Sequence, residues 1–461
     1  MKDSSRMATM PVFRLIVSMG LPSMLSMFVQ ALYNIVDSIF VSRLGESALT
    51  AVTLAFPIQM LAISVAVGTG VGLNSLISRR LGEGDRAAAD RAASHGVVLG
   101  ALSYALFAVF GLFFPRAFMD AFAENPATAA MGTDYLSVVC VFSMGVFIEV
   151  AIEKVLQATG NMIWPMVFML VGAITNLILD PIMIFGLLGC PAMGVRGAAI
   201  ATVIGQILSC IVAAVVMVTR SHEVRIRLRG FRFSAKTLRD IYAVGAPSII
   251  MQSIGSVMIM GLNSILIAFS EAAVSVLGVY FKLQSFVFMP VFGLTHGVLP
   301  VIGYNYGARH KDRIREAIRS GAAIAVVIMA VGTLIFLVFA PQLMGIFNPS
   351  AAMMAIGVPA LRIIGTCFVP AALAIILSTF YQAIGMGGKS LFISLMRQLF
   401  IILPLAWAFS RVGLWLVWYA FPIAEVVVLA VNFGIFSRVW QQKIVPLDAP
   451  APGAPAAVQE D

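Results

Sequence analysis

The chain contains its own sequence twice, and this duplication constrains the fold more than any other feature. A shift of 225 residues, without a gap, places many residues of the first half on identical residues of the second. The matched residues are Gly20, Pro22, Ala48, Phe56, Gln59, Gly68, Gly72 and Gly82, which fall on Gly245, Pro247, Ala273, Phe281, Gln284, Gly293, Gly297 and Gly307. A chain duplicated in this way predicts two similar lobes, one from each half.

Long apolar segments recur along the whole chain. The composition is 60% hydrophobic and only 11% charged over 461 residues, too apolar for a water-soluble domain of this size. Segments of ~20 or more apolar residues are long enough to cross a ~30 Å hydrocarbon core. We expect an all-α integral membrane protein with twelve spans, at about 12–43, 51–78, 92–114, 131–158, 162–188, 196–219, 241–269, 272–304, 317–340, 352–385, 388–410 and 414–440.

The repeat divides these spans into six plus six. We expect an N-terminal lobe over residues 1–220, a basic connector over 221–240, a C-terminal lobe over 241–440 and a disordered tail rich in Pro and Ala over 441–461. Because each half has an even number of spans, both lobes have the same orientation. They are therefore expected to be related by a pseudo-twofold axis along the membrane normal.

The basic residues predict the orientation in the membrane. With the N-terminus inside, the N-terminal segment and the loops on the same side hold 23 of the 30 Lys and Arg residues. This asymmetry follows the positive-inside rule and places both termini in the cytoplasm. The net charge of +9 is then a consequence of topology, which argues against a nucleic-acid partner.

Polar residues on four spans of the first half lie at a similar depth. On the first, fifth and sixth spans they recur three or four residues apart and so share one helix face, and the second span contributes a single residue. The set comprises Gln30, Tyr33, Asn34 and Asp37 on the first span, Gln59 on the second, Asn176 and Asp180 on the fifth, and Thr202 and Gln206 on the sixth. We expect these side chains to converge in the outer half of the membrane.

The two aspartates carry the functional interpretation. A charge in hydrocarbon costs ~3 kcal/mol or more, and neither Asp37 nor Asp180 has a basic residue at its level in the first half. Two neighbouring carboxyl groups resist joint ionisation, so they favour sharing a proton or a cation. The alternative is that each polar residue makes an ordinary hydrogen bond between helices.

The second half serves as an internal control, because the repeat replaces Asp37 and Asp180 by Leu262 and Leu405. The acids are therefore not needed to fold a six-span lobe. The second half has charges of its own. Lys282, Arg362 and Glu425 lie at similar depths, and we expect a structural ion pair among them, with a substrate role as the alternative. The roles of Arg397 and of Glu149 on the fourth span stay open.

No pattern in the chain indicates an enzyme or a cofactor. The four Cys and four His residues show no metal-binding or redox spacing. We also find no nucleophile paired with a base at one depth.

Several stretches of the chain resemble the multidrug and toxic compound extrusion (MATE) family, within it the bacterial multi-antimicrobial-extrusion and DinF-like branch. They are LYNIVDSIFVSRLG at 32–45, GTGVGLNSLISRRLGEGD at 68–85, NLILDPIMIFG at 176–186, GVRGAAIATVIGQ at 194–206 and FVFMPVFGLTHGVLPVIGYNYGAR at 286–309. The resemblance implies two six-helix lobes around a central cleft. It also implies a bacterial inner-membrane antiporter that contributes to antibiotic resistance. Such a protein exports amphipathic, cationic xenobiotics in exchange for H⁺ or Na⁺.

By this resemblance the family's coupling residues fall on Asp37, Asn176, Asp180 and Thr202. Their oxygens would suit Na⁺ as well as a proton, so the coupling ion stays open. The acids that a sodium-using branch carries in its second half have no counterpart here. We expect small-molecule substrates, a lipid bilayer around a monomer, and no cofactor. The alternative function is a flippase for lipid-linked precursors, which would need a strongly basic cavity.

Overall fold

The computed structural model describes residues 3–123 and 125–448, without the side chains of Asp3, Ser4, Asn34, Ser38, Ser42, Glu46 and Asp448. Ten of the described helices are long and apolar enough to cross a membrane, and two bent pairs raise the number of spans to twelve. The predicted all-helical membrane fold with twelve spans is therefore confirmed.

The N-terminal lobe begins with a short helix, α1 (Asp3–Thr9). Its spans are α2 (Val12–Ser42), α3 (Glu46–Gly82), α4 (Arg86–Phe113), the pair α6 (Pro126–Val141) and α7 (Met144–Ala158), α8 (Ile163–Phe185) and α9 (Gly194–Thr219). The short helix α5 (Pro115–Phe122) follows α4. The α6–α7 pair bends by 43°, so the fourth span is broken rather than straight.

The C-terminal lobe repeats this order. Its spans are α10 (Ala235–Leu266), α11 (Glu271–Gly307), α12 (Lys311–Val338), the pair α14 (Ala351–Gly365) and α15 (Phe368–Ala383), then Gly387–Ser410 and Leu414–Leu447. The eleventh span comprises α16 (Gly387–Leu395), a π-helical segment (Met396–Ile402) and α17 (Leu403–Ser410). The twelfth contains α18 (Leu414–Val417) and α19 (Ala420–Val439), and α13 (Ala340–Gly345) precedes α14. The α14–α15 pair bends by 48°, close to the 43° of its repeat counterpart α6–α7.

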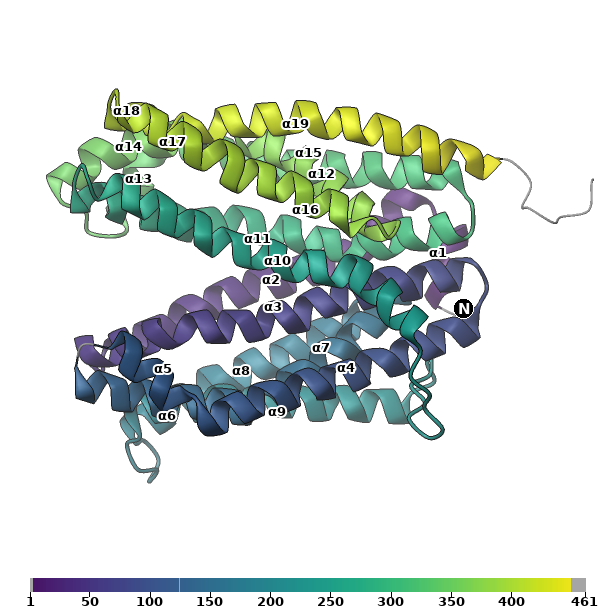
Figure 1. Ribbon diagram of the computed structural model, residues 1–461, viewed down its shortest axis with the longest axis horizontal. Helices are drawn as coiled ribbons and strands as arrows, with labels where there is room; N and C mark the ends of the chain where they lie inside the picture. The colour runs from purple at the N-terminus through teal and green to yellow at the C-terminus, as the bar shows by residue number, and fades with distance from the viewer. Residues whose placement is uncertain (1–2, 124, 449–461) are drawn as a thin grey trace, which may run out of the picture.

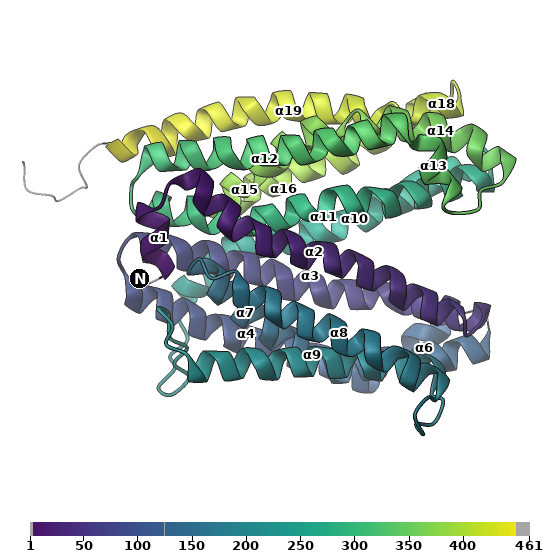
Figure 2. The same cartoon turned by 180° about the vertical axis from the view of Figure 1, so that it is seen from behind.

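The two lobes lie side by side, and four helices make most of the contact between them. Figures 1 and 2 show α2 and α3 of the N-terminal lobe next to α10 and α11 of the C-terminal lobe. The most extensive packing between lobes joins α3 to α10 and α2 to α11. These are the first two spans of each half, so the interface follows the repeat.

Repeat-related glycines allow the backbones to approach closely at this interface. A methyl group at Gly72 of α3 would collide with the carbonyl of Ile241 and with the backbone of Gly245 on α10. A methyl group at Gly297 of α11 would press on the backbone of Gly20 on α2. Small residues allow such contacts between membrane helices, where backbone packing stabilises association.

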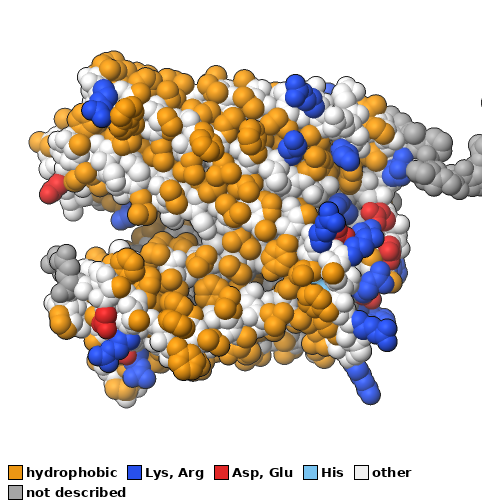
Figure 3. Space-filling view, viewed as in Figure 1, with side chains coloured by type: hydrophobic (Ala, Val, Ile, Leu, Met, Phe, Trp, Pro, Cys, Tyr) orange, Lys and Arg blue, Asp and Glu red, His pale blue; other side chains and the backbone are white. Residues whose placement is uncertain are grey.

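The interlobe contacts are concentrated toward one end of the molecule, where the basic residues gather. We call this the basic end; it contains Arg79–Arg91, residues 220–234 and Arg309–Arg319. At the opposite end, the open end, lie α5, α13 and α18. Figure 3 shows a hollow between the lobes there, which we call the cleft.

The connector between the lobes is bound to the N-terminal part of α4. The Asp90 carboxylate accepts from the Arg225 backbone N–H at 2.8 Å. The buried His95 accepts from the Ser234 backbone N–H at 2.9 Å through Nε2, and its Nδ1 lies 2.7 Å from the Arg91 carbonyl. Ser234 also caps α10, so this contact fixes the start of the C-terminal lobe.

The described chain stays helical beyond residue 441. The twelfth span continues through a π-helical turn (Trp440–Ile444) and a 3₁₀ turn (Val445–Asp448). The disordered tail is expected over 441–461, so its first part, 441–448, is helical instead, while residues 449–461 lie outside the described residues.

Candidate functional site

Asp37 points into the N-terminal lobe, away from the cleft. Phe28 marks the side of α2 that faces the other lobe, because its ring packs on Phe286 of α11 with 6.2 Å between centroids. Asp37 follows Phe28 by nine residues, or two and a half turns at about 3.6 residues per turn. The helix geometry therefore directs the Asp37 stripe at the bundle of α3–α9.

Asn176 and Asp180 lie one turn apart on α8, and both are buried. The Asn176 amide links Asp180 to Thr202 of α9. With its oxygen toward Thr202, the amide donates to Asp180 Oδ2 at 2.7 Å and accepts from the Thr202 backbone N–H at 3.0 Å. This orientation satisfies both ends of the amide, so it is the one that the hydrogen-bond network favours.

Asp37 and Asp180 meet across α2 and α8. Their carboxyl groups lie within hydrogen-bonding reach of each other. An ionised carboxylate can only accept, so a bond between the two would need a proton on one of them. The Tyr33 hydroxyl, one turn from Asp37, lies close to the two carboxyl groups and to the Thr202 side chain. Three helices thus contribute to one connected polar group.

Tyr135 of α6 is a member of this group that the polar stripes did not predict. Its buried hydroxyl donates to Gln59 Oε1 of α3 at 3.1 Å. It also lies close enough to Asp37, Asp180 and Tyr33 to interact with them electrostatically. The repeat could have identified it, since the position 225 residues later holds Ala360.

The structure therefore brings together Asp37, Tyr33, Asn176, Asp180, Thr202 and Gln59, with Tyr135 added. We call these seven residues the acid cluster. Gln30 and Gln206 are half-buried and make no side-chain hydrogen bond within the described part of the chain. The side chain of Asn34 lies outside the described residues.

Neither acid is neutralised by a basic side chain. No Lys, Arg or His among the described residues forms an ion pair with Asp37 or Asp180. The described residues also contain no group of three or more His, Cys, Asp or Glu side chains that could hold a metal ion. The cluster instead has two carboxyl groups surrounded by neutral oxygen and nitrogen atoms.

The C-terminal lobe has an ion pair where the sequence predicts one, but with a different base. The expected partners of Glu425 were Lys282 or Arg362, and this prediction is wrong. Glu425 Oε1 lies 3.3 Å from Arg397 Nη1, because Arg397 on the π-helical segment faces α19. Arg362 donates through Nε to the Leu337 carbonyl at 3.1 Å. Lys282 is exposed.

A second charged group of the N-terminal lobe lies toward the basic end of α7. Lys154 is buried and donates to Glu153 at 2.9 Å and to Gln157 at 3.0 Å. Lys154 is only 3% exposed, so its charge is compensated by Glu153 inside the lobe. Glu149 lies one turn earlier on the same helix, half-buried.

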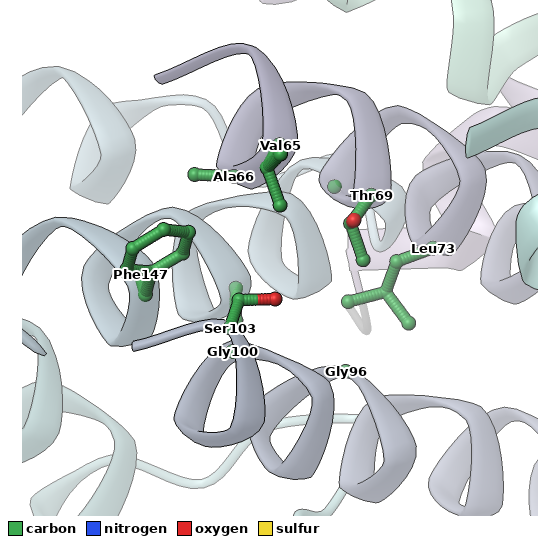
Figure 4. Close-up of a pocket in the computed structure, with 10 residues that line it drawn as sticks. Val65, Ala66, Thr69, Leu73, Gly96, Gly100, Ser103 and Phe147 are labelled. Atoms are coloured by element: carbon green, nitrogen blue, oxygen red, sulfur yellow. The ribbon is translucent and has the colours of Figure 1, made fainter. Parts of the chain in front are cut away.

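A separate gap between α3, α4 and α7 carries no site. Figure 4 shows Val65, Leu73 and Phe147 around it, with Ser103 and Thr69 as its polar side chains. Its volume is about 10 Å³, enough for one water molecule at most.

The twelve spans, the internal repeat and the buried acids define a two-lobed polytopic membrane protein with a polar site in one lobe. Comparison with known proteins identifies its family. The sequence profile of the MatE family matches residues 22–182 and 247–408, so the chain belongs to the MatE family. This family consists of transporters, as the sequence predicts, and not of enzymes.

Two curated relatives illustrate the similarity. The multidrug export protein MepA of Staphylococcus saprophyticus is 26% identical over 392 residues, which cover 85% of this chain and 86% of MepA. The FAD transporter of Shewanella oneidensis is 24% identical over 410 residues, covering 88% and 90%.

Solved structures agree with this result. A multidrug resistance MATE family transporter of the MOP superfamily, in an outward-facing conformation, superimposes with a TM-score of 0.90 at 29% identity. That match covers 96% of this chain and 98% of the other. A MOP superfamily transporter of Pyrococcus furiosus, described as having a binding pocket of reverse polarity, gives a TM-score of 0.89 at the same identity and coverage.

Proposed function

We propose that this transporter is an antiporter that exports amphipathic small molecules in exchange for H⁺ or Na⁺, with its coupling site at the acid cluster. The observation that carries the proposal is the close approach of Asp37 and Asp180, which meet across two helices without a basic partner. Such a pair can take up one positive charge at low cost and release it again.

The basic end is proposed to face the cytoplasm and the cleft to face outward. The concentration of Lys and Arg at the basic end supports this orientation through the positive-inside rule. The similarity to an outward-facing structure supports the outward assignment of the cleft. The expected location is then a bacterial inner membrane with both termini inside.

The coupling mechanism follows from the position of α2. This helix carries Asp37 on one face and contacts α11 with the other. A proton or Na⁺ entering from outside would lower the charge of the acid pair from −2 to −1, and α2 and α8 could then pack more closely. A change in α2 would alter the cleft wall and expel the substrate. Loss of the ion to the cytoplasm would reset the cycle.

Either ion fits the donor set. A proton would form a hydrogen bond between the carboxyl groups. For Na⁺, the carboxylates, the Asn176 amide oxygen and the Thr202 hydroxyl offer the oxygen ligands that hard cations prefer. Purified protein in proteoliposomes, with the pH and Na⁺ gradients imposed separately, distinguishes the two.

The decisive variant is Asp37→Asn, which keeps the shape of the side chain and removes its negative charge. We expect gradient-driven exchange to fall to background and substrate binding to lose its dependence on pH and Na⁺, because the variant permanently lacks one of the two acid charges. The matched control is Asp134→Asn, the same change at an exposed position of the neighbouring span α6. Exchange in Asp37→Asn that still responds to the gradient as the wild type does would refute the coupling role.

A further inference from the structure

The wall of the cleft carries a lysine that the coupling mechanism does not use. Lys282 lies on α11, four residues before Phe286, the residue that packs on Phe28 of α2. Residues four apart lie on the same face of a helix. Lys282 therefore continues, one turn nearer the open end, the face of α11 that is turned toward the N-terminal lobe.

From the Phe28–Phe286 contact toward the basic end, α2 and α11 stay in contact and close the space between the lobes. Gly293 and Gly297 of α11 touch α2 at Ser23–Met24 and Met19–Gly20. At the open end the lobes are apart, as Figure 3 shows. Lys282 is exposed although its face of α11 is turned toward the other lobe. The side chain thus lines the cleft just above its floor.

The opposite wall is apolar. Leu32 and Ile35 continue the Phe28 stripe of α2 toward the open end, and they are 43% and 37% exposed. Leu61, two turns before the Gly68 contact on α3, is also exposed at 43%. Exposed apolar side chains facing a hollow offer a surface for the hydrophobic part of a ligand.

Lys282 carries an uncompensated positive charge. Among the described residues no carboxylate lies within ion-pair distance of it, whereas Arg397 in the same lobe is paired with Glu425. Its ammonium group lies 6.0 Å from the centre of the Phe347 ring, a contact that orients a cation without neutralising it. The side chain therefore keeps its donors available for a ligand.

Polar groups on α10 extend the same wall. Gln252 and Ser256 follow the interlobe contacts Gly245 and Ile249 by two turns each, and both are exposed. The C-terminal wall can therefore donate hydrogen bonds beside the ammonium group, and the N-terminal wall offers hydrocarbon.

We propose that Lys282 is a specificity-determining residue that binds the acidic group of an amphipathic anion, whose apolar part lies on the α2 wall. The proposal deepens the proposed function and rests on it, since it names the substrate class of the same antiporter. The ligand's carboxylate, sulfonate or phosphate accepts from the lysine. An amphipathic cation is repelled by the same charge.

The test uses two dyes that share the xanthene ring system but differ in charge, anionic fluorescein and cationic rhodamine 6G. Binding to the full-length protein in nanodiscs is measured by fluorescence polarisation. We expect the wild type to prefer fluorescein. Lys282→Arg keeps that preference, and Lys282→Met weakens fluorescein binding by roughly tenfold, since one charge-assisted hydrogen bond is lost.

Lys282→Glu is expected to reverse the preference in favour of rhodamine 6G. The control for Lys282→Met is Lys236→Met, which makes the same change in net charge at an exposed residue in the first turn of α10. It should bind both dyes as the wild type does. Retained rhodamine 6G binding in Lys282→Met shows that this variant is folded. Unchanged fluorescein binding in Lys282→Met, or a wild-type preference for rhodamine 6G that Lys282→Glu does not increase, would overturn the proposal.

Two further experiments separate recognition from coupling, and a free anion from an anionic lipid. The ratio of fluorescein to rhodamine 6G affinity should be unchanged in Asp37→Asn, because Asp37 faces away from the cleft, so a failure of coupling is distinguishable from a failure of recognition. Vesicles with fluorescently labelled phosphatidylglycerol report transfer of an anionic lipid. Transfer that depends on Lys282, without fluorescein binding, would overturn the assignment to a free anion.

Discussion

The two lobes of this transporter have one scaffold and two different ways of burying charge. The N-terminal lobe joins Asp37 and Asp180 without a base, whereas the C-terminal lobe pairs Glu425 with Arg397 and places Leu262 and Leu405 at the repeat-related positions. Both arrangements fit a bundle of six spans with the same bends in the fourth span. The comparison shows that the fold does not need the acids and that the ion pair is not part of the repeat.

The largest expected effect comes from making the N-terminal lobe resemble its partner. The double variant Asp37→Leu/Asp180→Leu should fold with an unchanged or higher thermal midpoint, because apolar residues often replace buried charges without loss of stability. Gradient-driven exchange should be abolished. Thermal unfolding followed by size-exclusion chromatography, together with exchange in proteoliposomes, measures both. An aggregated or much less stable protein would show that the acids are structural, and the comparison would fail.

The ion pair of the C-terminal lobe should behave in the opposite way. Arg397→Met leaves Glu425 buried without its base, which costs ~3–5 kcal/mol of stability. The double variant Arg397→Met/Glu425→Leu should recover most of this loss. A double-mutant cycle of thermal midpoints measures the coupling. If Arg397→Met is as stable as the wild type but loses exchange, the pair is functional and the contrast between lobes disappears.

The repeat-related glycines at the contact between the lobes are common to both halves, so substituting them tests the shared scaffold. Gly72→Ala introduces a methyl group against the Ile241 carbonyl, so it should disfavour the packed basic end and shift the molecule away from the open-cleft state. Distances between spin labels at the open end report the shift. Gly434→Ala on α19, where a methyl group meets nothing within 4 Å, serves as the control and should leave the distances unchanged.

The smallest effect is expected at Tyr135. Tyr135→Phe removes the hydrogen bond to Gln59 and should lower stability by about 1 kcal/mol without abolishing exchange. Thermal unfolding measures the first quantity and proteoliposome exchange the second. A complete loss of exchange in this variant would place the Tyr135 hydroxyl at the centre of coupling rather than at its edge.

Residue patterns predicted a large part of this molecule. The twelve spans, the six-plus-six division and the meeting of Asp37, Asn176, Asp180 and Thr202 followed from apolar runs, the repeat and helix periodicity. Tyr135 was missed because a single tyrosine on an apolar span forms no polar stripe and is expected to pack as an aromatic residue. The partner of Glu425 was assigned wrongly, since equal depth in the membrane does not specify which helix face points at which neighbour.

The sequence by itself determined that this chain is a duplicated helical membrane protein with acids buried in one half, because hydrocarbon requires long apolar helices and makes an unpaired charge costly. Only the tertiary structure decided which faces of α2 and α11 meet, and so that Lys282 faces the cleft. Those directions depend on how α2 and α11 rotate when their glycines bring the two backbones together. That rotation results from contacts between residues more than 200 positions apart, which no local pattern records.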